Sequence, residues 1–288
     1  MHPKQLPQPS PPRPVRPSRL AFFDLDETLL SGKSMIDFLR SAPESLWAPG
    51  QEGAPGPGRT HGQAGLEKLA DLSRRGADRA EMNRAYYQLY AGVALSSLRA
   101  AGRAWYRDFT SRPEPYVSAS VAALAEHRRA GHMVVLVSGS AHPLVDPAAE
   151  ALRAELTLCT ELEVDDKGLL TGRVTRTMIG TDKARAVTEL RERHGVAAED
   201  CFAYGDHASD LAMLRAVGTA VVVGEDPVLL RHARQEGWSV LPGIAATVAG
   251  TSAPPQTPKT VTASASKGIS VAGHQKRPAG LSVQSRAG

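Results

Sequence analysis

Two carboxylates, Asp24 and Asp26, follow the short apolar run Leu20–Phe23. A bounded apolar run of this length predicts a buried strand, and both acids would stand at its carboxyl end. Ligands of open α/β sheets bind beyond the carboxyl ends of the strands. Acids crowded together repel one another, so such a pair is costly unless a bound cation offsets the charge or a reaction requires it. The pair alone is a weak pattern, so it predicts catalysis only if other segments supply matching groups.

Three later segments supply polar groups that also follow expected strands or turns. They are Ser138 and Gly139 after Val134–Val137, Lys183 after Gly180-Thr181-Asp182, and Asp206 and Asp210 around the end of Cys201–Gly205. Each has an ordinary structural interpretation when taken alone: a Ser-Gly turn, a solvated lysine early in a helix, or a helix N-cap with a first-turn acid. Their common order and strand-end settings favour a joint chemical role instead.

The four segments together resemble the haloacid dehalogenase superfamily of hydrolases, and within it class IB, the branch that includes the phosphoserine phosphatases. The resemblance covers about residues 19–242 and extends beyond the acids to Ser138–Pro147 and Asp206–Leu214. It implies an α/β fold, a doubly wound and mostly parallel Rossmann-like sheet with an inserted helical cap domain. The strand that carries Asp24 would be central, between the strands that carry Ser138 and Asp206.

The resemblance implies a catalytic role for each acid of the first pair. Asp24 would be the nucleophile that forms an aspartyl-phosphate, and Asp26 would be the general acid and base. Dehalogenases of the superfamily generally lack a carboxylate at the second position, and P-type ATPases have threonine there. The resemblance therefore implies a phosphatase.

The remaining residues would bind the metal and the phosphoryl group. Mg²⁺ favours six oxygen ligands, which suits a cluster of carboxylates and a phosphate. The family would use Asp24, the backbone carbonyl of Asp26 and Asp206, with Asp210 binding directly or through water. Phosphate binding would fall to Ser138, Gly139 and Lys183. The implied reaction is Mg²⁺-dependent hydrolysis of a small-molecule phosphomonoester.

Substrate selectivity is expected to depart from that of the phosphoserine phosphatases at Lys33. Those enzymes carry glutamate nine residues after the nucleophile, where it meets the substrate ammonium, and this chain has Lys33 there. The reversed charge disfavours L-phosphoserine and favours a second anionic or hydroxyl-rich group, unless Lys33 points to solvent. His207 stands where many relatives have serine, and it would either contact phosphate or fill space.

The domain boundaries follow from changes in pattern along the chain. Residues 19–33 and 113–246 would form the α/β core, and residues 34–112, with apolar residues at helical spacing, the cap. Tyr86, Tyr87 and Tyr90 are expected to pack between cap helices. The Gly/Pro-rich segment 47–62 predicts a mobile loop, residues 168–174 a small hairpin, and the tails 1–18 and 247–288 disorder.

Composition excludes several classes of protein. Of 288 residues, 42% are hydrophobic, enough for a sizeable core, and no segment has the length of a membrane span. The isoelectric point near 9.2 arises from tails that carry basic but no acidic residues, so the intervening chain is net acidic and nucleic-acid binding is disfavoured. Cys159 and Cys201 lie in apolar segments, which predicts free buried thiols and a cytoplasmic protein. The sequence does not define the oligomeric state.

Two alternative functions stay open at this point. A phosphotransferase would pass the aspartyl-phosphate to an acceptor other than water, and a non-enzymatic protein would bind partners through its tails. Arginine outnumbers lysine 26 to 8, a usage typical of GC-rich genomes such as those of actinomycetes. This usage associates the chain with bacterial secondary metabolism without identifying a substrate.

Overall fold

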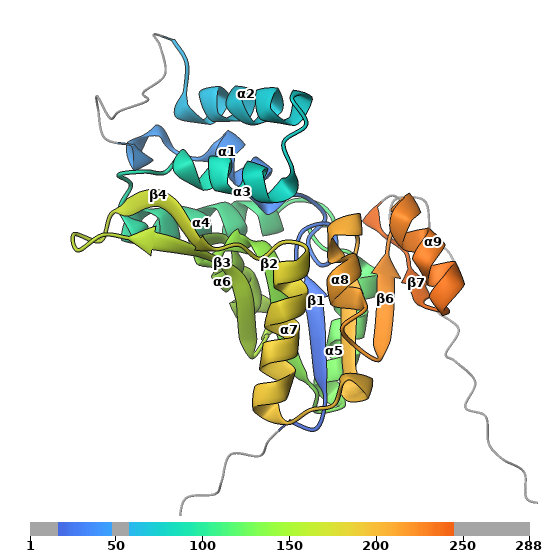
Figure 1. The fold of residues 1–288 in the computed structure, drawn as a ribbon. Coiled ribbons are helices and arrows are strands. Elements are labelled where there is room, and N and C mark those ends of the chain that lie inside the picture. The colour runs from blue at the N-terminus through green and yellow to red at the C-terminus, as the bar shows by residue number, and fades with distance from the viewer. Residues whose placement is uncertain (1–16, 48–57, 245–288) are drawn as a thin grey trace, which may run out of the picture. The chain divides into compact units, whose positions relative to one another are not determined.

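The computed structural model describes residues 17–47 and 58–244 (Figure 1). The predictions of disordered tails and of most of the loop 47–62 fall outside these residues. Within that loop, His61 and Gly62 form the first turn of a helix instead. No helix in the described part of the chain is both long enough and apolar enough to cross a membrane.

A seven-stranded sheet organises the described residues, in the order β4-β3-β2-β1-β5-β6-β7. Neighbouring strands are parallel except β3 and β4, which pair antiparallel. The prediction of a mostly parallel sheet with its first strand between the second and fourth motif strands is therefore confirmed. The strands are β1 (Leu20–Asp24), β2 (Met133–Ala141), β3 (Leu156–Val164), β4 (Leu170–Arg176), β5 (Cys201–Gly205), β6 (Thr219–Val223) and β7 (Ser239–Leu241).

Helices cover both faces of the sheet, which explains why the central strands are apolar on both sides. Alternate residues of β1 enter two different clusters: Leu20 and Phe22 pack with α7, α8 and α9, whereas Ala21 and Phe23 pack with α5 and α6. Figure 1 shows α7 and α8 on the near face of the sheet and α5 behind it. These helices are α5 (Ser118–Arg129), α6 (His142–Leu152), α7 (Thr181–His194), α8 (Leu211–Leu214) and α9 (Pro227–Glu236).

The long insertion between β1 and β2 is helical, as predicted. Its longest helix packs on the core: a Cβ at Gly102 would lie 2.0 Å from the carbonyl oxygen of Pro143 in α6, so only glycine permits this approach. Beyond α3, Gly92 donates a backbone hydrogen bond to Leu170 of β4, at 2.7 Å. The insertion contains α1 (Ser34–Ser41), the short 3-10 helix η1 (Glu44–Leu46), α2 (His61–Arg74), α3 (Arg79–Gln88) and α4 (Leu95–Thr110).

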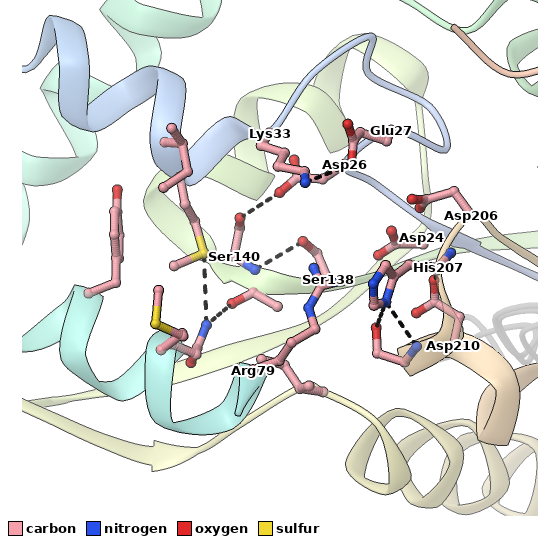
Figure 2. Close-up of a pocket in the computed structure, with 18 of the residues that line it drawn as sticks. Asp24, Asp26, Glu27, Lys33, Arg79, Ser138, Ser140, Asp206, His207 and Asp210 are labelled. Carbon is pink, nitrogen blue, oxygen red and sulfur yellow. Dashed lines mark hydrogen bonds and ion pairs between the residues drawn. The ribbon is translucent and has the colours of Figure 1, made fainter. Parts of the chain in front are cut away.

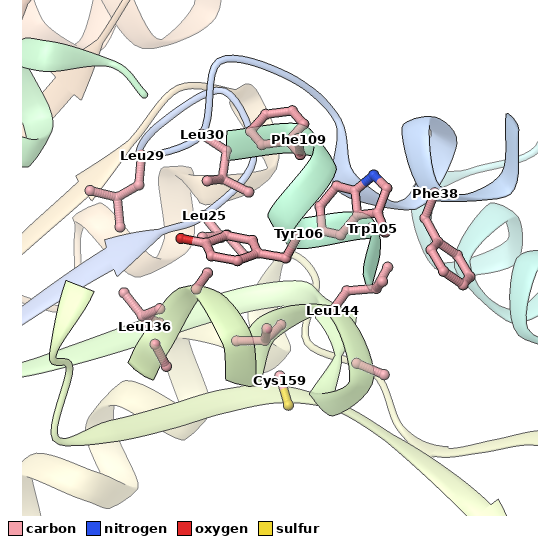
Figure 3. Close-up of a cluster of buried hydrophobic side chains, with 14 of the residues drawn as sticks. Leu25, Leu29, Leu30, Phe38, Trp105, Tyr106, Phe109, Leu136, Leu144 and Cys159 are labelled. Atoms are coloured by element: carbon pink, nitrogen blue, oxygen red, sulfur yellow. The ribbon is translucent and has the colours of Figure 1, made fainter. Parts of the chain in front are cut away.

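One hydrophobic cluster runs from the sheet into the insertion (Figure 3). Trp105, Tyr106 and Phe109 of α4 belong to the same cluster as Leu136 of β2 and Leu144 of α6. Burial of several large side chains, at about 1.5–3 kcal/mol each, fixes α4 to the core. The division into a core and a separate cap at residues 34 and 112 stays a prediction.

Candidate active site

A tight loop follows β1 and leaves Asp24 at the strand end. The backbone N–H groups of Leu29 and Leu30 both donate to the carbonyl of Leu25 at 2.9 Å, and Glu27 adopts a left-handed φ of 59°. The Thr28 hydroxyl donates to Asp206 at 2.8 Å, which ties the loop to the end of β5. The loop is therefore held between the neighbouring strand ends.

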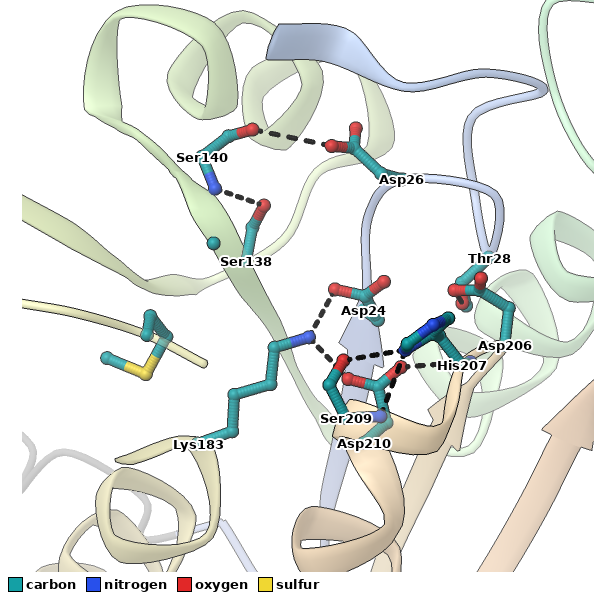
Figure 4. A network of polar contacts seen from close by, with 12 residues as sticks. Asp24, Asp26, Thr28, Ser138, Ser140, Lys183, Asp206, His207, Ser209 and Asp210 are labelled. Carbon is teal, nitrogen blue, oxygen red and sulfur yellow. Dashed lines mark hydrogen bonds and ion pairs between the residues drawn. The ribbon is translucent and has the colours of Figure 1, made fainter. Parts of the chain in front are cut away.

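Lys183 reaches the same point from the first turn of α7. Its side chain is buried, and Nζ donates to Asp24 Oδ1 at 2.5 Å and to Asp210 Oδ1 at 2.7 Å (Figure 4). Burial alone would lower the pKa of Lys183, but Asp210 and Asp24 outweigh burial and raise it. Lys183 is thus a buried cation between two carboxylates, which rules out the alternative of a solvated surface lysine.

Asp24, Asp206 and Asp210 form a cluster of carboxylates. Each offers an oxygen within 4.8 Å of the others. Burial, followed by the charges of Asp24 and Asp210, raises the pKa of Asp206 to about 9, and burial also raises the pKa of Asp24. A divalent cation would relieve this repulsion, and a set of donors made only of oxygen suits Mg²⁺. The residues present therefore fit the metal that the family implies.

Asp26 lies apart from that cluster, although only Leu25 separates it from Asp24 in the sequence (Figure 4). Ser34 donates to its carboxylate from both N–H and hydroxyl at 3.0 Å, and the Ser140 hydroxyl donates at 3.4 Å. Burial, followed by the charge of Asp24, raises the pKa of Asp26 to about 6. A carboxyl group that titrates close to neutrality is suited to general acid and base catalysis. The sequence alone does not identify Ser34 or Ser140 as partners of Asp26, since serines near a motif carry no distinctive signal.

Ser138 and Gly139 lie in β2 and line the same cavity, at an irregular turn of the strand where its pairing with β3 shifts register. Ser138 is buried, and its hydroxyl oxygen accepts a hydrogen bond from the N–H of Ser140 at 3.0 Å. This contact leaves the hydroxyl hydrogen available for a phosphoryl oxygen. A Cβ at Gly139 would lie 3.3 Å from Ile179, so a larger residue would crowd the turn.

The predicted site residues and the insertion helices enclose one cavity of about 170 Å³ (Figure 2). Every predicted catalytic, phosphate-binding, metal-binding and specificity residue lines it. The insertion contributes a second wall, which the sequence alone does not predict: Met35, Ile36, Leu69, Arg79, Met82, Asn83 and Tyr86. The last four residues share one face of α3, at spacings of three and four residues. That spacing was visible in the sequence, but it marks an ordinary core-facing helix equally well.

The tyrosine cluster is only partly a packing feature of the insertion. Tyr86 and Tyr90 are buried and their hydroxyls lie 3.0 Å apart, but Tyr86 also lines the cavity. The Tyr87 hydroxyl accepts a hydrogen bond from the N–H of Ala141 in β2 at 2.6 Å. Tyr87 therefore joins α3 to the core.

Lys33 lies at the mouth of the cavity, where it lines the site and also faces solvent. Its side chain is 57% exposed, and Nζ lies 3.3 Å from Glu27 Oε2. The charge that the sequence places at this position is therefore offset by a neighbouring acid. The left-handed turn at Glu27 brings the two side chains together, and the spacing of residues alone does not reveal such a turn.

His207 caps the turn that follows β5. Its Nδ1 accepts a hydrogen bond from the N–H of Ser209 at 3.0 Å, so His207, not Asp206, is the N-cap. The cap begins a 3-10 turn over Ala208–Asp210, which is followed by the short α8. The His207 ring also lines the cavity, so a phosphate contact stays open.

The carboxyl edge of the mostly parallel sheet holds buried carboxylates, a lysine that pairs with two of them, and an acid, Asp26, with a pKa of about 6. This combination is typical of an α/β hydrolytic enzyme. The chain belongs to the haloacid dehalogenase-like hydrolase family, whose family model matches residues 21–215. Within that family it is a phosphoric monoester hydrolase of the phosphoserine-phosphatase-like branch.

Similar proteins support this placement. A probable phosphatase of Mycobacterium tuberculosis is 36% identical over 225 residues, which cover 77% of this chain and 74% of that protein. A phosphoserine phosphatase of the same species is 29% identical over 79% of this chain and 71% of its own length. A solved structure from Bordetella pertussis, of a protein of unknown function, has a TM-score of 0.64 at 27% identity and covers 78% of this chain and 98% of that one.

Proposed function

We propose that this protein is a Mg²⁺-dependent phosphatase that hydrolyses a small-molecule phosphomonoester through an aspartyl-phosphate at Asp24. The observation that supports it most is the different environment of two neighbouring acids. Asp24 pairs with the buried cation Lys183 at 2.5 Å, whereas Asp26 is bonded to uncharged serines and has a pKa of about 6. Burial raises the pKa of Asp24, but the neighbouring Lys183 cation opposes this rise and favours the Asp24 anion. Asp26 has no such cation beside it and can carry a proton.

The first half of the reaction transfers the phosphoryl group to the enzyme. Lys183, the Ser138 hydroxyl and the N–H groups of the turn at Gly139 hold the phosphoryl oxygens and offset their charge. Asp24, the Asp26 carbonyl, Asp206 and Asp210 would hold Mg²⁺, which would supply further positive charge to the phosphoryl oxygens. An Asp24 oxygen attacks phosphorus as the ester P–O bond breaks, and Asp26 donates its proton to the leaving oxygen.

The second half releases phosphate and restores both acids. Asp26, now a carboxylate, takes a proton from a water molecule as the water attacks phosphorus. The bond between phosphorus and the Asp24 oxygen breaks, which regenerates the Asp24 carboxylate and frees inorganic phosphate. A pKa of about 6 suits both roles because both forms of Asp26 are accessible near neutral pH.

The mouth of the cavity favours a substrate without an ammonium group beside the phosphoester. Lys33 is offset by Glu27, whereas the Arg79 side chain, which also lines the cavity, forms no ion pair with an acid among the described residues. Two cations and one acid therefore face an entering substrate. L-phosphoserine would bring its ammonium to this mouth, whereas a second acidic group would be attracted. The proposed substrates are phosphoesters of the latter kind.

Phosphate release over a panel of phosphorylated metabolites tests the proposal. L-phosphoserine and 3-phosphoglycerate form a matched pair, because a hydroxyl group replaces the ammonium. We expect Mg²⁺-dependent release that favours 3-phosphoglycerate, and none from Asp24→Asn. The folding of that variant is checked by its melting temperature.

Three outcomes would contradict parts of this proposal. Unchanged release in excess chelator or in Asp24→Asn would reject the mechanism. Consumption of the phosphoester that requires an added alcohol acceptor and yields a new phosphoester in place of inorganic phosphate would favour a phosphotransferase. A preference for L-phosphoserine would reject the substrate assignment alone.

A further inference from the structure

One backbone carbonyl at the phosphate-binding turn is held from both walls of the cavity. The Gly139 oxygen accepts a hydrogen bond from the Thr160 hydroxyl of β3 at 2.7 Å. It accepts a second one from Asn83 Nδ2 of α3, also at 2.7 Å. A core strand and an insertion helix therefore meet at a single peptide group.

This peptide group controls the orientation of Ser138. A trans peptide is planar, so its carbonyl and its N–H point in opposite directions. The N–H of the same peptide belongs to Ser140 and donates to the Ser138 hydroxyl oxygen at 3.0 Å (Figure 2). Holding the Gly139 carbonyl therefore directs the N–H at Ser138 and fixes the hydroxyl that would bind phosphate.

Asn83 is an unfavourable residue for stability alone. It is 3% exposed, and its Oδ1 is buried without a hydrogen-bond partner among the described residues. An unsatisfied buried acceptor costs about 1–3 kcal/mol. A leucine of similar size would avoid that cost. Exceptions of this kind call for an explanation other than packing.

We propose that Asn83 is a positioning residue. It links the packing of α3 against the core to the orientation of Ser138 in the phosphate-binding turn. With α3 in place, Asn83 completes the pair of donors on the Gly139 carbonyl and so orients Ser138 toward the phosphoryl group. The inference rests on the proposed function, because it requires a phosphoryl group beside Ser138. By linkage, phosphate binding and the seating of α3 favour each other.

Tyr87 provides a matched control on the same helix. Its hydroxyl also accepts a hydrogen bond from β2, at Ala141 N, but it does not line the cavity. Tyr87→Phe thus removes one contact between α3 and the core without touching the Gly139 peptide. Asn83→Leu removes the contact to that peptide and also the unsatisfied acceptor.

The test measures inorganic phosphate affinity by calorimetry in the presence of Mg²⁺, together with kcat, KM and melting temperature. In Asn83→Leu we expect phosphate affinity to fall about tenfold, with an equal or higher melting temperature. In Tyr87→Phe we expect a lower melting temperature and a phosphate affinity within about twofold of the wild type. Unchanged phosphate affinity in Asn83→Leu would overturn the proposal.

A double variant with Thr160→Val sharpens this test. If both donors hold one carbonyl, the loss of either leaves the other, and the loss of both should weaken phosphate binding by more than the two single effects combined. Strictly additive effects would mean that Asn83 acts elsewhere, and would overturn the proposal. The readout is phosphate binding and does not depend on hydrolysis. A wild-type protein that binds phosphate but hydrolyses no ester would therefore refute the proposed function, and the phosphate affinities of the variants would still decide the role of Asn83.

Discussion

The two walls of the cavity differ in how completely their polar groups are paired. On the core wall, Asp24, Lys183 and Asp26 all have protein partners before any substrate arrives. On the insertion wall, the Arg79 side chain forms no ion pair with an acid among the described residues, and the buried Asn83 acceptor is unsatisfied. The core thus holds a prepared reaction centre, whereas the insertion contributes an exposed cation that a substrate can engage.

This difference predicts different consequences of mutation. The core wall gathers residues from β1, β2, α7 and the end of β5, so a change there should affect every substrate. The insertion wall is built largely from one face of α3. A change at its exposed residue Arg79 should depend on the organic part of the substrate, whereas Asn83 should affect every substrate through the Gly139 peptide.

Replacement of the proposed general acid should have the largest effect. Asp26→Asn is expected to lower kcat by about 10²- to 10⁴-fold for alkyl phosphates, because the leaving oxygen no longer receives a proton. Aryl phosphates have better leaving groups, so their loss should be smaller. Steady-state kinetics on a matched alkyl and aryl pair would measure this. Equal losses for both would point to a disturbed metal site instead.

Removal of the buried cation should destabilise the core wall. Lys183→Met leaves Asp24 and Asp210 buried without their partner, and breaking a buried ion pair in this way costs about 3–5 kcal/mol. Chemical denaturation would measure the loss, and added Mg²⁺ should restore part of it by offsetting the same charges. A variant as stable as the wild type without metal would contradict the proposed electrostatics.

Acid should weaken the core through His127, beneath the site. Its Nε2 lies 2.9 Å from the Tyr204 hydroxyl, and burial, followed by His132, lowers its pKa to about 4. Neutral histidine is favoured in the folded state, whereas the unfolded chain gains a proton near pH 6.5. The stabilisation is complete above that pH and is progressively lost as pH falls toward 4.

The measurement is the free energy of unfolding between pH 7 and pH 4.5. His127→Gln, which cannot titrate, should lose less stability over this range than the wild type. Identical pH profiles for the two proteins would show that His127 is not held neutral.

The smallest expected effect concerns the insertion wall. Arg79→Leu should raise KM about twofold to fivefold for phosphoesters that carry a second acidic group, equivalent to about 0.5–1 kcal/mol, and should change KM little for an aryl phosphate without a second charged group. Since Arg79 is exposed, the melting temperature should not change. Equal shifts for both substrates would erase the proposed contrast between the two walls.

The sequence predicted the core wall because strand-end signals are local. An apolar run followed by Asp24 indicates both a strand and its carboxyl end, and a parallel sheet brings such ends to one edge. The sheet order around β1 followed from the family resemblance and is confirmed. The short α8 was not foreseen, because the His207 cap that starts the turn is an unusual one.

The insertion wall could not be predicted in the same way. Met82 and Tyr86 repeat at helical spacing whether they face a core or a cavity, and only the approach of α3 to β2 decides between these cases. The contact between Asn83 and Gly139 joins residues 56 positions apart. The partial neutralisation of Lys33 likewise depends on the backbone turn at Glu27, a tertiary feature that charge patterning does not show.

Trapping of the covalent intermediate tests the central claim most directly. A rapid acid quench of the Asp26→Asn variant with an aryl phosphate and Mg²⁺ should accumulate a phosphoryl group, because the water that resolves it lacks its base. Peptide mass spectrometry should place that group on Asp24, and neutral hydroxylamine should remove it. Turnover without any phosphorylated enzyme, or a phosphoryl group on Ser138, would contradict the account.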